Sequence, residues 1–253
     1  MAGTRRDDIG ISVYSPALES GDGRPLAIVR ATERAFPGLR WEWMTTDAGQ
    51  PSLFMFMERD QSWVIRGQGF PLGCNSGPES EVMTIWGVER PASLAPGGLP
   101  LFDVYVSLPP DANGIATAGD VLEAVSEAAH AFWGEATPRN AAADILRQIQ
   151  EPHTKEAPPR GLPAIKAPEE IASPEIPQYL GWLNHWSAAA ARAIGFPDPE
   201  RDADLLSRAR RTASGGWLVR LTDGPLELDK PAHLDALKRT YERFSRIGGR
   251  SSS

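Results

Sequence analysis

Ile9-Gly-Ile-Ser-Val-Tyr14 is the stretch that decides the fold, because its apolar residues alternate with small ones. A period of two predicts a strand with one buried face, and Pro16 ends it. A helix is expected from Pro25 to Phe36, since proline is favoured at the first helical position. Leu39–Met44 then predicts a second strand, so the chain opens with a strand-helix-strand unit.

Three further strands are expected around Trp63–Arg66, Val82–Trp86 and Leu101–Val106. Turns rich in glycine and proline separate them, which favours an antiparallel or mixed sheet. Asp111–Gly114 predicts a turn, because asparagine and glycine tolerate positive φ. A helix is expected after it, capped by Thr117, with an apolar stripe formed by Val121, Leu122, Val125, Ala129, Phe132 and Trp133.

The C-terminal half begins with a proline-rich segment, which holds seven prolines between Pro152 and Pro177. They predict an extended chain, either an interdomain linker or a strap across the surface, with a docking ligand for another protein as the alternative. A helix is then expected from Tyr179 to Ile194, and a second from Asp198 that ends at Gly215-Gly216.

A strand over Trp217–Leu221 and a last helix over His233–Phe244 complete the expected α+β fold. It consists of a mixed or mostly antiparallel sheet with flanking helices, and a helix-rich C-terminal part joined by the Pro-rich strap. The expected organisation is an α/β lobe with a mixed sheet over residues 9–150, a linker or strap over 151–177, and a helical part with one strand over 178–247. The last part is expected to pack on the first as a single unit.

The formal net charge is -7, which argues against nucleic acid as a partner because phosphate contacts need clustered lysine and arginine. The charge is uneven along the chain. Residues 201–253 carry 11 basic and 7 acidic residues, hence +4, so the first 200 residues carry -11. An acidic, solvated surface is the simpler interpretation, and a basic partner is the alternative.

The single cysteine, Cys74, excludes a disulfide framework and a multi-cysteine zinc site. Asp7 and Asp8 stand where a signal peptide would be apolar, and no run approaches the ~18 apolar residues that span a bilayer. A cytoplasmic protein with no membrane contact is therefore expected.

Residue patterns that carry catalysis or metal binding are scarce. The four histidines show no i, i+4 pair: His130, His153, His185 and His233. The acidic residues of Asp198–Asp204 lack the glycine and distal glutamate of a calcium loop. No glycine-rich phosphate loop is present. We therefore expect neither a metal nor a cofactor.

Cys74 is the one candidate nucleophile, in the glycine-flanked stretch Pro71–Gly77, although a lone cysteine is more often a small buried residue. Three arginines near the expected helix end could hold an anion: Arg208, Arg210 and Arg211. Interaction with the helix dipole explains them more simply.

The tryptophan cluster supplies the candidate binding residues. On a helix, Tyr179, Trp182 and Trp186 would share one apolar face, which favours burial in the core. The alternative is an aromatic anchor for a partner, since tryptophan and tyrosine are frequent in binding hot spots. The candidate set comprises Tyr179, Trp182, Asn184, His185, Trp186, Trp41 and Trp43.

Several stretches resemble an uncharacterised family of soil-bacterial, myxobacterial-type proteins. They are Val13–Leu18, Asp22–Leu26, Phe132–Pro138, Tyr179–Ser187, Ile194–Asp198 and Gly215–Thr222. In layout, the opening strand-helix-strand, the mixed sheet and a late strand are similar to immunity proteins of polymorphic toxin systems. That resemblance implies a small cytoplasmic binder without catalysis, and it carries over no functional residue.

These observations favour a non-catalytic protein- or peptide-binding protein with a polypeptide partner, and the leading hypothesis is an immunity-type protein that neutralises a toxin. One alternative is a peptide-binding accessory protein that holds a precursor peptide in natural-product biosynthesis. Another is an enzyme whose site, the Cys74 thiol or a histidine-carboxylate pair, is assembled only in three dimensions.

Overall fold

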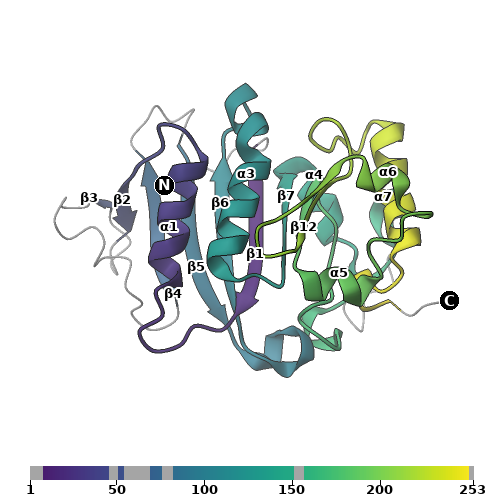
Figure 1. The fold of residues 1–253 in the computed structure, drawn as a ribbon, viewed down its shortest axis with the longest axis horizontal. Coiled ribbons are helices and arrows are strands. Elements are labelled where there is room, and N and C mark those ends of the chain that lie inside the picture. Colours follow the sequence, from purple (N-terminus) through teal and green to yellow (C-terminus); the bar gives the residue numbers. More distant parts are fainter. Residues whose placement is uncertain (1–7, 46–50, 54–68, 76–81, 151–156, 251–253) are drawn as a thin grey trace.

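The computed structural model describes residues 8–45, 51–53, 69–75, 82–150 and 157–250 (Figure 1). The strands are β1 Ile9–Pro16, β2 Trp41–Thr45, β3 Pro51–Leu53, β4 Gly69–Asn75, β5 Thr84–Arg90, β6 Leu101–Leu108, β7 Trp133–Pro138, β8 Ile149–Gln150, β9 Ile165–Lys166, β10 Leu183–Trp186, β11 Ala209–Arg211 and β12 Trp217–Arg220. The α-helices are α1 Arg24–Ala35, α3 Ala112–Ala129, α4 Arg139–Leu146, α5 Ala188–Ile194, α6 Ala203–Leu206 and α7 Pro231–Arg243. Short 3₁₀ helices are η2 Ala92–Leu94, η3 Pro96–Gly98, η4 Pro159–Gly161, η5 Pro168–Glu170 and η6 Ile247–Gly249.

β1 lies inside a ten-stranded sheet of order β11-β12-β10-β7-β1-β6-β5-β4-β2-β3, in which every pairing is antiparallel. β8 and β9 form a separate parallel pair. The alternation predicted for β1 is confirmed, since Ile9, Ile11 and Val13 are buried and Ser12 is only half-buried. The α+β class is therefore confirmed.

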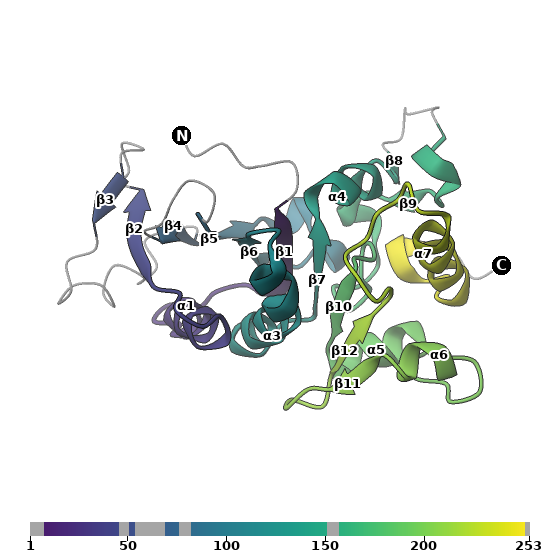
Figure 2. The same ribbon diagram turned by 90° about the horizontal axis from the view of Figure 1, so that it is seen from above.

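The helices lie on both faces of this sheet (Figure 2). α1 and α3 pack side by side on one face, where Trp41 of β2 donates to Thr32 Oγ1 of α1 at 2.8 Å. α4 and α7 lie on the other face, toward the β7 and β10 end. Over β4 and β5 the second face carries no described α-helix.

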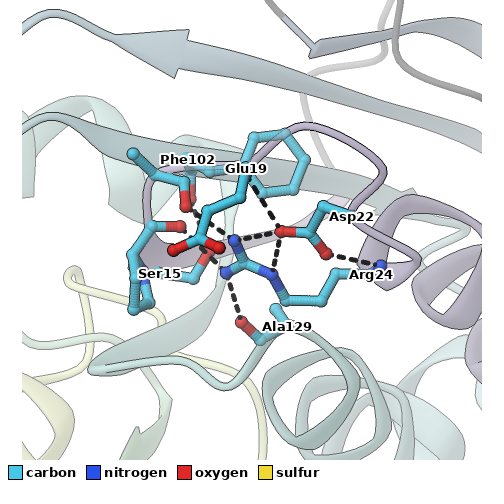
Figure 3. A network of polar contacts seen from close by, with 8 residues as sticks. Ser15, Glu19, Asp22, Arg24, Phe102 and Ala129 are labelled. Carbon is cyan, nitrogen blue, oxygen red and sulfur yellow. Dashed lines mark hydrogen bonds and ion pairs between the residues drawn. The ribbon is translucent and has the colours of Figure 1, made fainter.

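Arg24, at the start of α1, ties the first helix to the sheet and to α3 (Figure 3). Its Nη1 donates to the carbonyl oxygens of Pro16 at 2.9 Å and Ala129 at 3.2 Å, and its Nη2 donates to Ala17 O at 2.7 Å. Asp22 holds the same guanidinium from the other side, through Nε at 2.8 Å. One half-buried charge therefore joins the end of β1, the following loop and the C-terminus of α3.

The helix predicted through the tryptophan cluster is wrong. Leu183–Trp186 is strand β10, paired with β7 and β12, and helix α5 begins only at Ala188. Ser187 caps that helix by accepting from Ala190 N at 3.1 Å. The aromatic and apolar residues of this stretch recur at intervals of 3, 4 and 7, which is the spacing of a helix face. Backbone pairing with two neighbouring strands overrides this local preference.

α3 begins at Ala112 and is capped by Asp111, six residues before the predicted cap Thr117. The Asp111 carboxylate caps it by accepting from Gly114 N at 2.7 Å, so the predicted turn is the first turn of the helix. The helix ends at Ala129, because His130 adopts a left-handed conformation with φ 53°. Trp133 therefore belongs to β7 rather than to the helical stripe.

Gly215-Gly216 does not end a helix. α6 stops at Leu206, and β11 and β12 form an antiparallel hairpin with these glycines in its connection. Arg210 and Arg211 thus lie on a strand, and Arg210 pairs with Asp120 of α3 at 2.7 Å. Cys74 also lies on a strand, β4, and not in a turn. The strand predicted at Trp63–Arg66 falls outside the described residues.

The expected last helix is confirmed as α7, and β10, β11 and β12 extend the sheet that β1 to β7 form. In the proline-rich segment, the described residues from 157 onward include β9, η4 and η5. The division into a lobe, a strap and a helical part stays a prediction.

Candidate functional site

A cleft of about 320 Å³ is lined by residues of α4 and of the sheet. α4 lies on the sheet face opposite α1 and α3 (Figure 2). The floor of the cleft is one row of cross-strand neighbours: Trp86 stands opposite Tyr105, Tyr105 opposite Ser12, and Ser12 opposite Glu135. This register brings four strands, β5, β6, β1 and β7, to one site. The first two turns of α4 and the segment before β10 form the walls.

Glu135 is the buried acid of this cleft, with 5% of its surface exposed. Thr137 Oγ1 donates to its Oε2 at 2.6 Å. Burial raises the pKa of Glu135 to about 7, and the hydroxyls of Thr137 and Ser12 offset only part of this rise. The carboxyl group is therefore divided between its charged and neutral forms near neutral pH.

Gly181 lets the segment before β10 pack closely on Glu135. A β-carbon at position 181 would lie 2.4 Å from Thr137 Oγ1 and 2.5 Å from Glu135 Oε2, closer than atoms can approach. Only glycine fits this close approach. The backbone N–H of Trp182 then donates to Thr137 Oγ1 at 3.2 Å, which fixes the hydroxyl that holds Glu135.

Tyrosines and one ion pair lie on the same face of the sheet as the acid. The hydroxyls of Tyr179 and Tyr14 are 2.5 Å apart, and burial raises the pKa of both. Tyr105 donates to Asp103 Oδ2 at 3.3 Å, and Arg90 Nε donates to the same oxygen at 2.9 Å. Burial also raises the pKa of Tyr105 to about 12. These hydroxyls are neutral hydrogen-bonding groups at physiological pH.

The predicted binding residues are mostly buried. Trp41, Trp182, Asn184, His185 and Trp186 are each at most 3% exposed. Trp182 Nε1 donates to Thr222 O at 3.0 Å, and the Asn184 amide bonds the backbone of Gly181. Trp43 is half-buried on β2.

Among the predicted binding residues, only Tyr179 lines the cleft. A part in binding stays a prediction for the whole set.

The histidine-carboxylate pair that the enzyme hypothesis requires does occur, but it lies within the packed structure. His185 Nε2 is 3.7 Å from Glu127 Oε1 of α3, too long for a hydrogen bond. This contact, followed by the Ser214 hydrogen bond, lowers the pKa of Glu127 to about 2. His185 is 1% exposed and does not line the cleft, so the pair joins α3 to the β10 side of the sheet.

Cys74 is half-buried, and burial raises the pKa of its thiol, which disfavours the thiolate that a nucleophile needs. Within the described ranges, no three His, Cys, Asp or Glu residues come close enough to hold a metal ion. No described helix is both long and apolar enough to cross a membrane.

The cleft residues Trp86, Tyr105, Glu135 and Arg139 were not recognised in the sequence. The signal that could have found Glu135 is the alternation in Trp133–Pro138. The polar residues Glu135 and Thr137 point to one strand face, and the small residues Gly134 and Ala136 point to the other. This signal was hidden because Trp133 was assigned to the preceding helix.

Comparison with known proteins gives a family and a fold. The model of a domain of unknown function, DUF5953, matches residues 20–252. A solved structure, the Pseudomonas aeruginosa T6SS protein PA0821, is similar with a TM-score of 0.55 and 14% identity, over 94% of this chain and 76% of that one. At this identity the likeness shows the fold alone. No curated protein matches the sequence.

Proposed function

The chain belongs to the DUF5953 family, and from its structure we propose that it is a non-catalytic binding protein of the immunity type, which neutralises a toxin by covering part of its surface. The observation that carries this proposal is the sheet face over β4 and β5 on which no described α-helix lies, here called the open face (Figure 2). Val88 there is 39% exposed and Leu72 is 36% exposed, beside the half-buried Trp86 and Tyr105.

This face of the sheet is buried at one end and exposed at the other. At β7 and β10 it is covered, since Trp133 and Trp186 are at most 2% exposed and Trp186 packs on Phe244 with ring centroids 5.4 Å apart. At β5, Trp86 stacks on its cross-strand neighbour Tyr105 with ring centroids 4.9 Å apart, and it makes no other ring contact with the described residues. An exposed apolar and aromatic patch with a polar rim is typical of a protein-binding surface.

Two further observations support the proposal. The chain shares its fold with a Pseudomonas aeruginosa protein named as a T6SS protein, and that name is consistent with a toxin-related role. The net charge of -11 over the first 200 residues, which include β4, β5 and β6, would attract a basic partner.

The experiment is co-expression of this chain with each protein encoded by the genes beside its own, after each has been tested for toxicity alone. We expect the chain to restore growth and to form a stoichiometric complex, measured by calorimetry on the purified proteins. Val88→Asp should weaken that complex at least tenfold, because a charge would be buried in an apolar contact. Leu99→Asp is the matched control, since Leu99 is 55% exposed but lies outside the face.

A toxin that kills cells equally with and without this chain, together with no complex at micromolar concentrations, would contradict the immunity function. Equal weakening by both substitutions would place the contact elsewhere on the surface.

The cleft favours a second candidate, a peptide-binding accessory protein. Its floor combines hydroxyl groups, aromatic rings and one buried acid, which suits a short polar segment. Binding of the neighbouring precursor peptide, with no effect on any toxin, would favour this function over the first.

A further inference from the structure

We infer that the cleft binds a small zwitterion, a free amino acid or a dipeptide, through Glu135 at one end and Arg139 at the other. This site adjoins the proposed toxin contact, because Trp86 and Tyr105 line the cleft and also border the open face over β4 and β5, but Glu135 and Arg139 belong to the cleft alone. Its two charged side chains each lack the partner that burial demands.

The first of these side chains is Glu135. No lysine or arginine of the described residues forms an ion pair with it, and its hydrogen-bonding neighbours are the hydroxyls of Thr137 and Ser12. Burying a charged carboxylate that is only 5% exposed is unfavourable unless a cation lies beside it. The pKa of Glu135 rises to about 7 because burial disfavours its charged form. An ammonium group in the cleft would supply the missing charge.

The second is Arg139, the first residue of α4. Its Nε is buried and has no hydrogen-bond partner, although the residue as a whole is only half-buried. Within the described residues its guanidinium forms no ion pair either. A guanidinium is a planar fork that matches a carboxylate, so an anionic group in the cleft would satisfy Nε.

Glu135 and Arg139 are spaced so that one ligand can reach both. They are four residues apart, at the middle of β7 and directly after its end, and both line the cleft. They form no ion pair with each other. A molecule that carries an ammonium and a carboxylate would bridge them, whereas a simple cation or anion would leave one group unpaired.

The volume and the walls indicate the rest of the ligand. About 320 Å³ is at the small end of ligand pockets, which suits an amino acid or a dipeptide. The stacked rings of Trp86 and Tyr105 face Leu146 of α4, which is 47% exposed. An apolar side chain between them would remove these surfaces from water.

The test is a titration of the whole chain with leucine at pH 8, followed by Trp fluorescence and by NMR. At this pH Glu135 is mostly ionised. Tyr179 and Tyr241, which interact with it, and Tyr105, which lines the same cleft, stay neutral because burial raises their pKa. We expect saturable binding, and at least tenfold weaker binding of N-acetyl-leucine, which lacks the ammonium, and of leucinamide, which lacks the carboxylate. Leucyl-leucine distinguishes a dipeptide from a free amino acid.

Two substitutions test which side chain binds which charged group of the ligand. Glu135→Gln should weaken the binding of leucine at least tenfold but leave the binding of N-acetyl-leucine unchanged. Arg139→Gln should weaken the binding of leucine but leave the binding of leucinamide unchanged. Glu242→Gln and Arg192→Gln are matched controls at exposed positions on α7 and α5. Equal binding of leucine and its blocked forms, or no binding of any zwitterion at millimolar concentration, would overturn the inference. Toxin neutralisation that persists in both cleft variants would leave the proposed function intact.

Discussion

At the scale of single residues, the charge state of Glu135 couples the stability of the fold to pH. Its pKa is about 7 in the folded chain against 4.5 when solvated, so the folded state holds a proton that the unfolded state releases. Stability therefore falls as pH rises from about 4.5 through 7. The 2.5-unit difference corresponds to about 3 kcal/mol.

Glu135→Gln removes this penalty while keeping the shape of the side chain. We expect the variant to be more stable than the parent at pH 8, by about 3 kcal/mol at most, and to gain nothing at pH 4.5. Urea unfolding at several pH values measures the difference. A stability difference that stays constant across this range would show that the carboxyl does not titrate in the cleft.

Arg24 is a second residue whose contacts predict a large effect. Its guanidinium bonds three backbone carbonyls and Asp22, and its side chain is 12% exposed. Arg24→Ala would leave these groups without a donor, so we expect a loss of about 2–4 kcal/mol in the free energy of unfolding. Arg34→Ala, exposed on the same helix, should change it by less than about 0.5 kcal/mol.

At the scale of elements, two glycines test how tightly the segments pack. Gly181→Ala would force a β-carbon against Thr137 and Glu135, and we expect it to cost about 1–3 kcal/mol. Gly119 lies inside α3, where an added β-carbon would make ordinary contacts with Leu218 at 3.5 Å and Leu183 at 3.8 Å. Gly119→Ala should therefore stabilise the chain by about 0.5–1 kcal/mol. Thermal unfolding that gives both variants the same sign of change would contradict the packing of the segment before β10.

The elements also show what the sequence could predict. Strand β1 and helices α1 and α7 were recognisable, because their apolar periodicity agrees with the faces they bury. β10 was not, because four residues buried on both faces carry no strand period, and the aromatic spacing fits a helix. β7 failed for a related reason, since all six of its residues are buried.

The cleft could not be predicted because its residues meet only through the register of the sheet. Trp86, Tyr105, Ser12 and Glu135 are far apart in sequence, and a shift of one residue in any pairing would send a side chain to the α3 face. A single sequence gives the faces of isolated strands but not the order of strands in the sheet. The sequence could place Glu135 on a polar strand face, but not in one cross-strand row with Ser12 and Tyr105.

At the scale of the whole molecule, the continuous sheet predicts how the chain unfolds. β10 pairs with β7, so the parts before and after the proline-rich segment share backbone hydrogen bonds. Tyr14 bonds Tyr179 across the same boundary, and Gln148 donates to Tyr241 of α7 at 3.2 Å. Both contacts are buried, so neither part can lose its fold without exposing polar groups and apolar surface of the other.

We therefore expect one cooperative transition, with the same midpoint when unfolding is followed by backbone circular dichroism and by tryptophan fluorescence. A fragment that ends at residue 150 would expose the edge of β7 and the buried face of Trp133, and it should not fold on its own. The full chain with its proline-rich segment cut by a protease should instead stay associated, since the sheet holds both halves. Two separate transitions, or a folded fragment with the circular dichroism of a native sheet, would show that the halves are independent domains.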